Sequence, residues 1–193
     1  GSMYYHQGDL ERAFQVFEAA MRLCATLGDL VGESMALYNM SLVYFDLRRL
    51  AEARDATERA MQLSERAGDL RSGAIARSHH GALLREDERY EEAEAHLLAA
   101  AKTLSELGAG IYEASALCEL GLAYLGGERF EEASRALARG ISLLRVHQEL
   151  RLMGLYTGFL AAAEAFQGNR EAATRLLTEA RAALRAHADP RLF

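Results

Sequence analysis

The chain has 193 residues, 50% of them hydrophobic, and a formal net charge of −6 from 22 basic and 28 acidic side chains. This composition is typical of a chain that buries a core without disulfides or metals. The acidic balance argues against nucleic acid as a partner, because a phosphate backbone is bound by clustered lysine and arginine. No apolar run reaches the roughly 18 residues that cross a bilayer, and the first residues lack a signal-peptide pattern. We therefore expect a cytoplasmic protein that binds neither nucleic acid nor membrane.

The chain is expected to be helical almost throughout. Its single proline is Pro190, so nothing before that residue has to interrupt a helix, and 16 glycines remain to form turns. Its two cysteines, Cys24 and Cys118, are far apart in the sequence and lack metal-ligand spacing. They are interpreted as free thiols.

An internal repeat organises the sequence. One alanine recurs every 40 residues, at Ala13, Ala53, Ala93, Ala133 and Ala173. Within each unit the apolar residues are spaced by three and four, which indicates two helices, and a turn such as Gly126-Gly127 separates them. Gly28 and Gly68 are expected to end helices in the left-handed conformation. The aspartates that follow them, Asp29 and Asp69, are expected to cap the next helices.

Two of the units resemble the tetratricopeptide repeat family. Residues 116–133, ALCELGLAYLGGERFEEA, read almost like its consensus, and residues 36–53, ALYNMSLVYFDLRRLAEA, follow the same pattern. The 40-residue period is most similar to the long repeats of Leu-Gly-Asn adaptor proteins and kinesin light chains. The resemblance implies an all-α, right-handed α-solenoid of stacked helix pairs. The third unit departs from it, with Arg77 and His80 at positions where the family has large apolar residues.

The predicted organisation is one array preceded by a short remnant. Residues 1–3 are assigned to a tag remnant and the start of the chain. A single array follows over 4–193, with repeats at 4–30, 31–70, 71–110, 111–150 and 151–190. The first repeat is partial because Met3 aligns with Val43, which lies well inside a helix. We therefore expect an excised fragment, or a mis-set start, of a longer array.

No catalytic or cofactor signature is present in the sequence. It contains no phosphate-binding glycine loop, no GxSxG and no HExxH. His79 and His80 are adjacent, which on a helix points them about 100° apart rather than at one metal ion. Cys118 is interpreted as a small apolar filler, and Glu91, Glu92 and Glu94 as the solvated start of a helix. We predict no enzyme activity, no cofactor and no metal.

The resemblance implies a concave surface lined by the first helix of each pair. Ten residues are predicted to line it as a protein- or peptide-binding groove: Met35, Tyr38, Asn39, Leu42, Phe45, His79, Arg85, Glu119, Leu122 and Phe159. Family members that grip a peptide carboxylate use lysine, arginine and asparagine on this face. Only Asn39 and Arg85 represent that chemistry here, so a carboxylate clamp is not expected.

The predicted function is a non-enzymatic scaffold whose apolar groove holds a protein or an amphipathic peptide, with self-association as a further form of binding. Three alternatives stay open. The chain could be a sensor or oligomerisation segment of a larger bacterial transcriptional or signalling regulator. It could belong to a peptide-regulated phosphatase, although no helical catalytic domain is found. Finally, the stripe residues could pack on one another and bind nothing.

Overall fold

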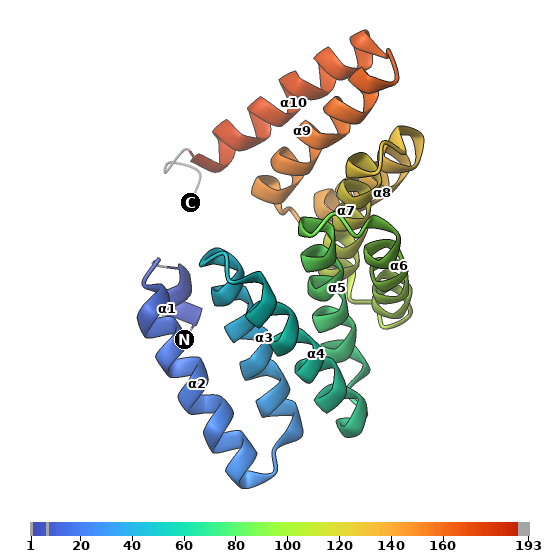
Figure 1. Ribbon diagram of the computed structural model, residues 1–193. Helices are drawn as coiled ribbons and strands as arrows, with labels where there is room; N and C mark the ends of the chain where they lie inside the picture. The colour runs from blue at the N-terminus through green and yellow to red at the C-terminus, as the bar shows by residue number, and fades with distance from the viewer. Residues whose placement is uncertain (1, 7, 189–193) are drawn as a thin grey trace.

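The computed structural model describes residues 2–6 and 8–188, and the regular structure in those ranges is helical throughout. Figure 1 shows the helices stacked one after another along a curved solenoid. The elements are α1 (Ser2–His6), α2 (Leu10–Leu27), α3 (Leu30–Asp46), α4 (Leu50–Ala67), α5 (Leu70–Glu86), α6 (Tyr90–Glu106), α7 (Gly110–Gly126), α8 (Phe130–Val146), α9 (Leu150–Phe166) and α10 (Arg170–Ala188). The predicted fold class is confirmed.

Each helix and its following turn occupy 20 residues, so two helices fill one 40-residue unit. A residue with positive φ recurs at this spacing through the described chain, at Gly8, Gly28, Arg48, Gly68, Glu88, Gly108, Glu128, Gln148 and Gly168. The predicted helix ends at Gly28 and Gly68 are confirmed, with φ of 70° and 69°. Asp29 and Asp69 cap α3 and α5 by accepting hydrogen bonds from the backbone amides of Gly32 and Ser72.

The turn after α7 differs in detail from the prediction. Gly126 is the last helical residue and Gly127 has a φ of −82°, while the left-handed position is taken by Glu128 with a φ of 58°. Gly126 instead allows a close approach, because a Cβ there would lie 2.5 Å from the ring of Tyr90. The glycine pair therefore serves packing rather than the left-handed turn.

Small residues set the distance between the two helices of a unit. Ala93 and Ala133, members of the 40-residue column, are completely buried. At Gly121 a Cβ would lie 2.5 Å from Cγ of Leu137, so α7 and α8 approach too closely for a larger side chain. Hydrophobic clusters fill the junctions along the array, which therefore has a continuous core between successive helices.

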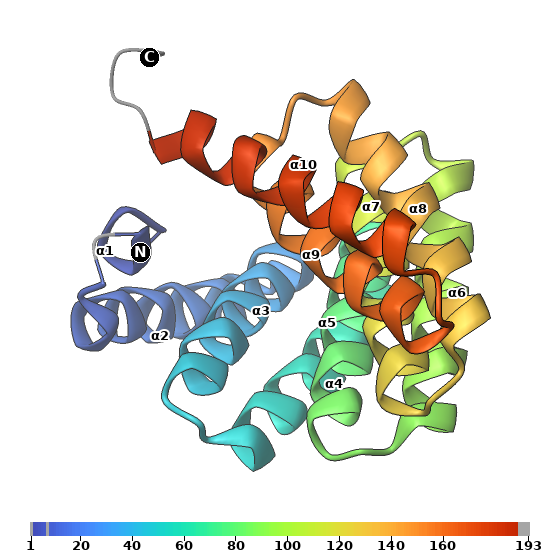
Figure 2. The same ribbon diagram turned by 90° about the horizontal axis from the view of Figure 1, so that it is seen from above.

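The array curves so that odd-numbered and even-numbered helices lie on opposite sides. In Figure 1, α3, α5, α7 and α9 line the inner side of the curve, and α4, α6, α8 and α10 lie outside them. Seen from above in Figure 2, the helix axes change direction from one pair to the next. Gly1 and residues 189–193, which the predicted organisation assigns to the tag remnant and the end of the array, lie outside the described residues.

Candidate binding groove

The inner side of the array contains a cavity of about 240 Å³ built by four successive inner helices. The lining residues are Tyr38 of α3, Ile75, Ser78, His79 and Ala82 of α5, Leu104 of α6, Ile111, Tyr112, Ser115 and Glu119 of α7, and Tyr156 of α9. Three predicted groove residues, Tyr38, His79 and Glu119, therefore meet in one place. Because each inner helix supplies side chains at intervals of three and four, the curvature of the stack brings them together.

His79 is held at the centre of an aromatic group. Its ring packs edge-on against Tyr38, with centroids 5.8 Å apart, and against Phe45 at 5.9 Å. The ring also forms a hydrogen bond with the backbone of Ser41, but burial outweighs it and lowers the pKa of His79 to about 4. Burial likewise raises the pKa of Tyr38 to about 12. The imidazole and the phenol are therefore both neutral at pH 7.

The charged residues of the groove are paired with each other. Arg85 donates to Glu119 Oε2 from Nε at 3.2 Å and lies 3.1 Å from it through Nη2. The other carboxylate oxygen of Glu119 accepts a hydrogen bond of 2.9 Å from the Tyr156 hydroxyl. Burial and the neighbouring Glu119 raise the pKa of Tyr156. Arg85 and Glu119, both predicted to bind a partner, thus link α5, α7 and α9 within the chain.

The same chain of charges continues toward the turn after α3. Arg85 Nη1 donates to Glu86 Oε1 at 2.8 Å, and Arg48 Nη1 donates to Glu86 Oε2 at 3.1 Å. These pairs neutralise the inner surface, so that the charge left for an incoming ligand is small. A groove of this kind is suited to an apolar partner surface rather than to a free carboxylate.

The other predicted residues differ in accessibility. Met35 is 53% exposed and Phe159 is 37% exposed. Asn39, Leu42 and Phe45 are half-buried. Leu122 is half-buried too, but it packs against the core cluster that contains Cys118 and Leu137. Leu122 therefore contributes to the core as well as to the inner surface.

The sequence reasoning missed two aromatic residues that line the cavity. Tyr112 is a cavity residue that is 41% exposed, and the Arg71 guanidinium lies 5.7 Å from its ring centroid. Tyr156 also lines the cavity, although the 40-residue period aligns it with Ala36, the residue next to the predicted groove residue Met35. An aromatic residue at the edge of the expected face was the available signal. It was insufficient because a shift of one residue turns a side chain by about 100°.

The interpretation of Cys118 as an apolar filler agrees with its surroundings. Its side chain is completely buried, and Cβ of an alanine at position 140 would lie 2.5 Å from its sulfur. Burial raises the pKa of the Cys118 thiol, which makes the nucleophilic thiolate less available. Among residues 2–6 and 8–188, no group of three or more His, Cys, Asp or Glu side chains could hold a metal ion.

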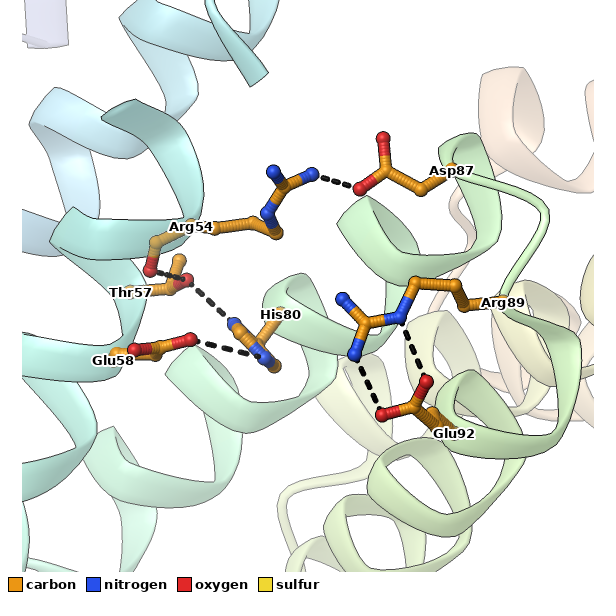
Figure 3. A network of polar contacts seen from close by, with 7 residues as sticks. All are labelled: Arg54, Thr57, Glu58, His80, Asp87, Arg89 and Glu92. Carbon is orange, nitrogen blue, oxygen red and sulfur yellow. Dashed lines mark hydrogen bonds and ion pairs between the residues drawn. The ribbon is translucent and has the colours of Figure 1, made fainter. Parts of the chain in front are cut away.

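A second polar cluster lies between the outer helix α4 and the next pair, α5 and α6 (Figure 3). Thr57 donates its hydroxyl hydrogen to the Arg54 carbonyl at 2.8 Å, so His80 Nδ1, 3.0 Å away, must donate to Thr57 Oγ1. His80 Nε2 lies 3.9 Å from Glu58 Oε1. Burial and the nearby His96 lower the pKa of His80 to about 4.

Ion pairs surround this cluster on its outer side. Arg54 pairs with Asp87, and Arg89 forms a two-pronged pair with Glu92 at 2.7 and 2.6 Å (Figure 3). Of the two departures in the third unit, His80 is 5% exposed and sits at the packing position, whereas Arg77 is exposed. The cluster is a junction between units, and its side chains face one another rather than a cavity.

Comparison with known proteins supports the repeat assignment. A family model described as "Tetratricopeptide repeat" matches residues 1–66. A sequence comparison with curated proteins finds no match. Within the described part of the chain, no helix is both long and apolar enough to span a membrane.

Several solved structures share the fold at low sequence identity. The nearly identical TPR-like repeats of a candidate kinesin light chain from Podosopora anserina match with a TM-score of 0.71 and 16% identity, over 98% of this chain and 93% of that one. A Rap protein complexed with Competence and Sporulation Factor matches with a TM-score of 0.86 and 14% identity, over 97% and 52%. Aspartyl phosphate phosphatase F from Bacillus subtilis matches with a TM-score of 0.82 and 14% identity, over 97% and 50%.

The chain spans about half the length of the Rap protein and of phosphatase F. These likenesses establish the fold, which over nearly the whole chain is that of tetratricopeptide-like repeat proteins. The predicted resemblance to tetratricopeptide repeats is confirmed, by sequence over residues 1–66 and by structure beyond them.

Proposed function

We propose that this chain is a non-enzymatic binding module that holds a protein segment or an amphipathic peptide on its inner face. The observation that carries the proposal is the cavity shared by α3, α5, α7 and α9, which is lined mainly by apolar and aromatic side chains. Exposed apolar residues on the same helices, Met35, Leu155 and Phe159, extend this surface beyond the cavity. Exposed apolar surface of this kind commonly marks an interaction site.

Two further features support a partner that is itself a protein. The charges of the groove are already paired within the chain, so binding is expected to depend on apolar contacts at helical spacing. A similar fold occurs in the Rap protein solved with Competence and Sporulation Factor, although this chain spans only about half of that protein. The paired charges and the similar fold are the two reasons for which we propose that this chain binds a peptide.

The absence of catalysis is part of the proposal. Phosphatase F has a similar fold, but this chain covers 50% of it. The buried thiol of Cys118 and the paired carboxylate of Glu119 are both poorly suited to act as nucleophiles. Cytoplasmic location and bacterial origin stay predictions from the sequence.

The experiment is a selection of peptides from a random library on the purified chain, followed by titration of one selected peptide by fluorescence anisotropy. The double variant Tyr112→Ser with Phe159→Ser removes two exposed groove aromatics. We expect it to weaken binding by roughly thirtyfold, the effect of losing about 2 kcal/mol at an interface. The matched control is Leu98→Ser on the outer helix α6, where the side chain is 46% exposed.

Equal loss of affinity in Leu98→Ser and in the groove variant would contradict the inner face as the site. Selection of no peptide would contradict peptide binding itself. Sedimentation velocity of the unmodified chain tests whether the partner is a second copy of the chain. A concentration-dependent dimer that the groove variant abolishes would identify a second copy as the partner.

A further inference from the structure

A polar atom beside the groove cavity is left unsatisfied by the fold. His79 lines the cavity, and its Nε2 is buried with no hydrogen-bond partner among the described residues. A buried polar atom without a partner is rare, because it loses its bonds to water and gains nothing in return. Such an atom beside a cavity is a candidate for bonding to a ligand.

The hydrogen bonding of the ring identifies Nε2 as an acceptor. The imidazole bonds to the backbone of Ser41, and because Nε2 has no partner, that bond must come from Nδ1. A neutral imidazole carries one hydrogen, so Nδ1 is the donor and Nε2 presents a lone pair. A ligand group that meets Nε2 must therefore bring its own N–H or O–H.

The size and lining of the cavity indicate what carries that donor. A volume of about 240 Å³ lies below the roughly 300–1,000 Å³ of pockets for drug-sized molecules, so it suits a single large side chain. Three tyrosines, Tyr38, Tyr112 and Tyr156, contribute aromatic walls. Such walls favour a planar ring by edge-to-face or offset contacts.

The electrostatics favour a neutral donor over a cationic one. The carboxylate of Glu119 is the acidic group that lines the cavity, and it already accepts from both Arg85 and Tyr156. A lysine or arginine of the ligand would have to compete with Arg85 for it. A neutral N–H or O–H on an aromatic ring meets the vacant acceptor without that competition.

We propose that this cavity receives one aromatic side chain carrying a hydrogen-bond donor, the indole of tryptophan or the phenol of tyrosine, and that its donor bonds to His79 Nε2. The inference rests on the proposed function, since it names the anchoring side chain of the segment bound in the groove. Because Nε2 is buried in the free chain, the proposed bond requires the imidazole to turn toward the cavity.

The test titrates the intact, ¹⁵N-labelled chain with three single-residue probes: N-acetyl-tryptophanamide, N-acetyl-tyrosinamide and N-acetyl-phenylalaninamide. Long-range ¹H–¹⁵N spectra report the imidazole nitrogens directly. We expect the tryptophan and tyrosine probes to shift the Nε2 signal of His79 saturably, and the phenylalanine probe to leave it in place. The relative affinities of the first two probes decide which ring the cavity prefers.

Two variants distinguish the contribution of the hydrogen bond to probe binding from that of the cavity shape. His79→Phe keeps a ring of similar shape but lacks the acceptor, and we expect it to weaken the donor-bearing probes by about threefold to tenfold, the range for one hydrogen bond. It should leave the phenylalanine probe unchanged, as measured on a Tyr112 ring signal. The matched control is His147→Phe at the exposed end of α8, which should bind all three probes as the unmodified chain does.

The outcomes distinguish this inference from the proposed function. No saturable shift with the tryptophan or tyrosine probe overturns the inference, even if peptide selection on the groove succeeds. Equal affinity for the phenylalanine probe also overturns it. Saturable binding to the unmodified chain supports it whether or not His79→Phe folds. If the probes bind but no peptide is selected, it is the proposed function that fails.

Discussion

His79 and His80 are neighbours in the sequence but occupy two different environments. His79 points into the groove among Tyr38 and Phe45 and keeps an unsatisfied acceptor. His80 lies between α4, α5 and α6, where its Nδ1 donates a hydrogen bond to Thr57 Oγ1. Both have a pKa of about 4 because both are buried. Two adjacent positions of the inner helix α5 thus place one histidine beside the groove cavity and the next in a junction between units.

The junction around His80 also differs from its counterparts along the array. At the equivalent positions of the other junctions, the facing residues share a hydrophobic cluster: Phe17 with Met40, Leu97 with Leu120, and Leu137 with Leu160. Only the pair of Thr57 and His80 is polar among these. The comparison teaches that a hydrogen bond can replace an apolar contact in a repeat, provided that both partners change together.

The largest expected effect is on the pH dependence of stability. In the unfolded chain a histidine ionises near 6.5, whereas His79 and His80 have folded pKa values of about 4. The unfolded state therefore binds more protons, and stability falls as pH drops from about 6.5 to about 4. Each histidine accounts for up to about 3 kcal/mol. Urea unfolding of His79→Phe and His80→Leu near pH 7 and pH 4 should reveal a smaller loss in each variant than in the unmodified chain.

The carboxylates of the chain also titrate in this range, so the difference between variant and unmodified protein is the quantity to compare. If His80→Leu keeps the full pH dependence, His80 is not held neutral by the junction. If His79→Phe alone keeps the full pH dependence of stability, the groove is hydrated enough to accommodate the imidazolium form of His79.

The next effect concerns the hydrogen bond of the junction. Thr57→Val preserves the shape of the side chain but removes the oxygen that accepts from His80 Nδ1. A buried donor left unsatisfied costs about 1–3 kcal/mol, which urea unfolding at pH 7 measures. Thr57→Ser keeps the hydroxyl and serves as the control. In the double variant Thr57→Leu with His80→Leu, which restores an apolar pair, we expect most of the lost stability to return.

A smaller loss is expected on the inner side at Leu122. Since its side chain is half-buried against the cluster of Cys118 and Leu137, Leu122→Asp should destabilise the fold by about 1–2 kcal/mol. Thermal melting followed by circular dichroism checks this. A melt identical to that of the unmodified chain would mean that Leu122 is turned fully to the groove, as the sequence alone suggested.

The smallest effect is expected at an exposed aromatic residue of the groove. Phe159 is 37% exposed and its ring centroid lies 6.5 Å from that of Tyr156. We expect Phe159→Ser to change the free energy of unfolding by less than about 0.5 kcal/mol. A loss of more than about 1 kcal/mol would place Phe159 in the core rather than on the open surface of the groove.

The repeat itself could be predicted because each of its determinants is local or periodic. The alanine column predicted the buried contacts at Ala93 and Ala133, and the Gly-Asp pairs predicted the helix ends and caps at Gly28 and Gly68. Left-handed residues without a glycine signal, such as Glu128, were not predictable. Their backbone is imposed by the 20-residue spacing of the stack rather than by their own preference.

The sequence by itself determined the all-helical class of fold and the 40-residue period, because these follow from spacing along one chain. The resemblance to tetratricopeptide repeats added which helices face inward. Only the tertiary structure decided which inward residues remain available to a partner. Arg85 and Glu119 are 34 residues apart, and their pairing depends on the offset between successive units. The same offset brings Tyr112 and Tyr156 into the cavity beside His79. Packing between helices sets this offset, and the contacts that determine it join residues distant in the chain.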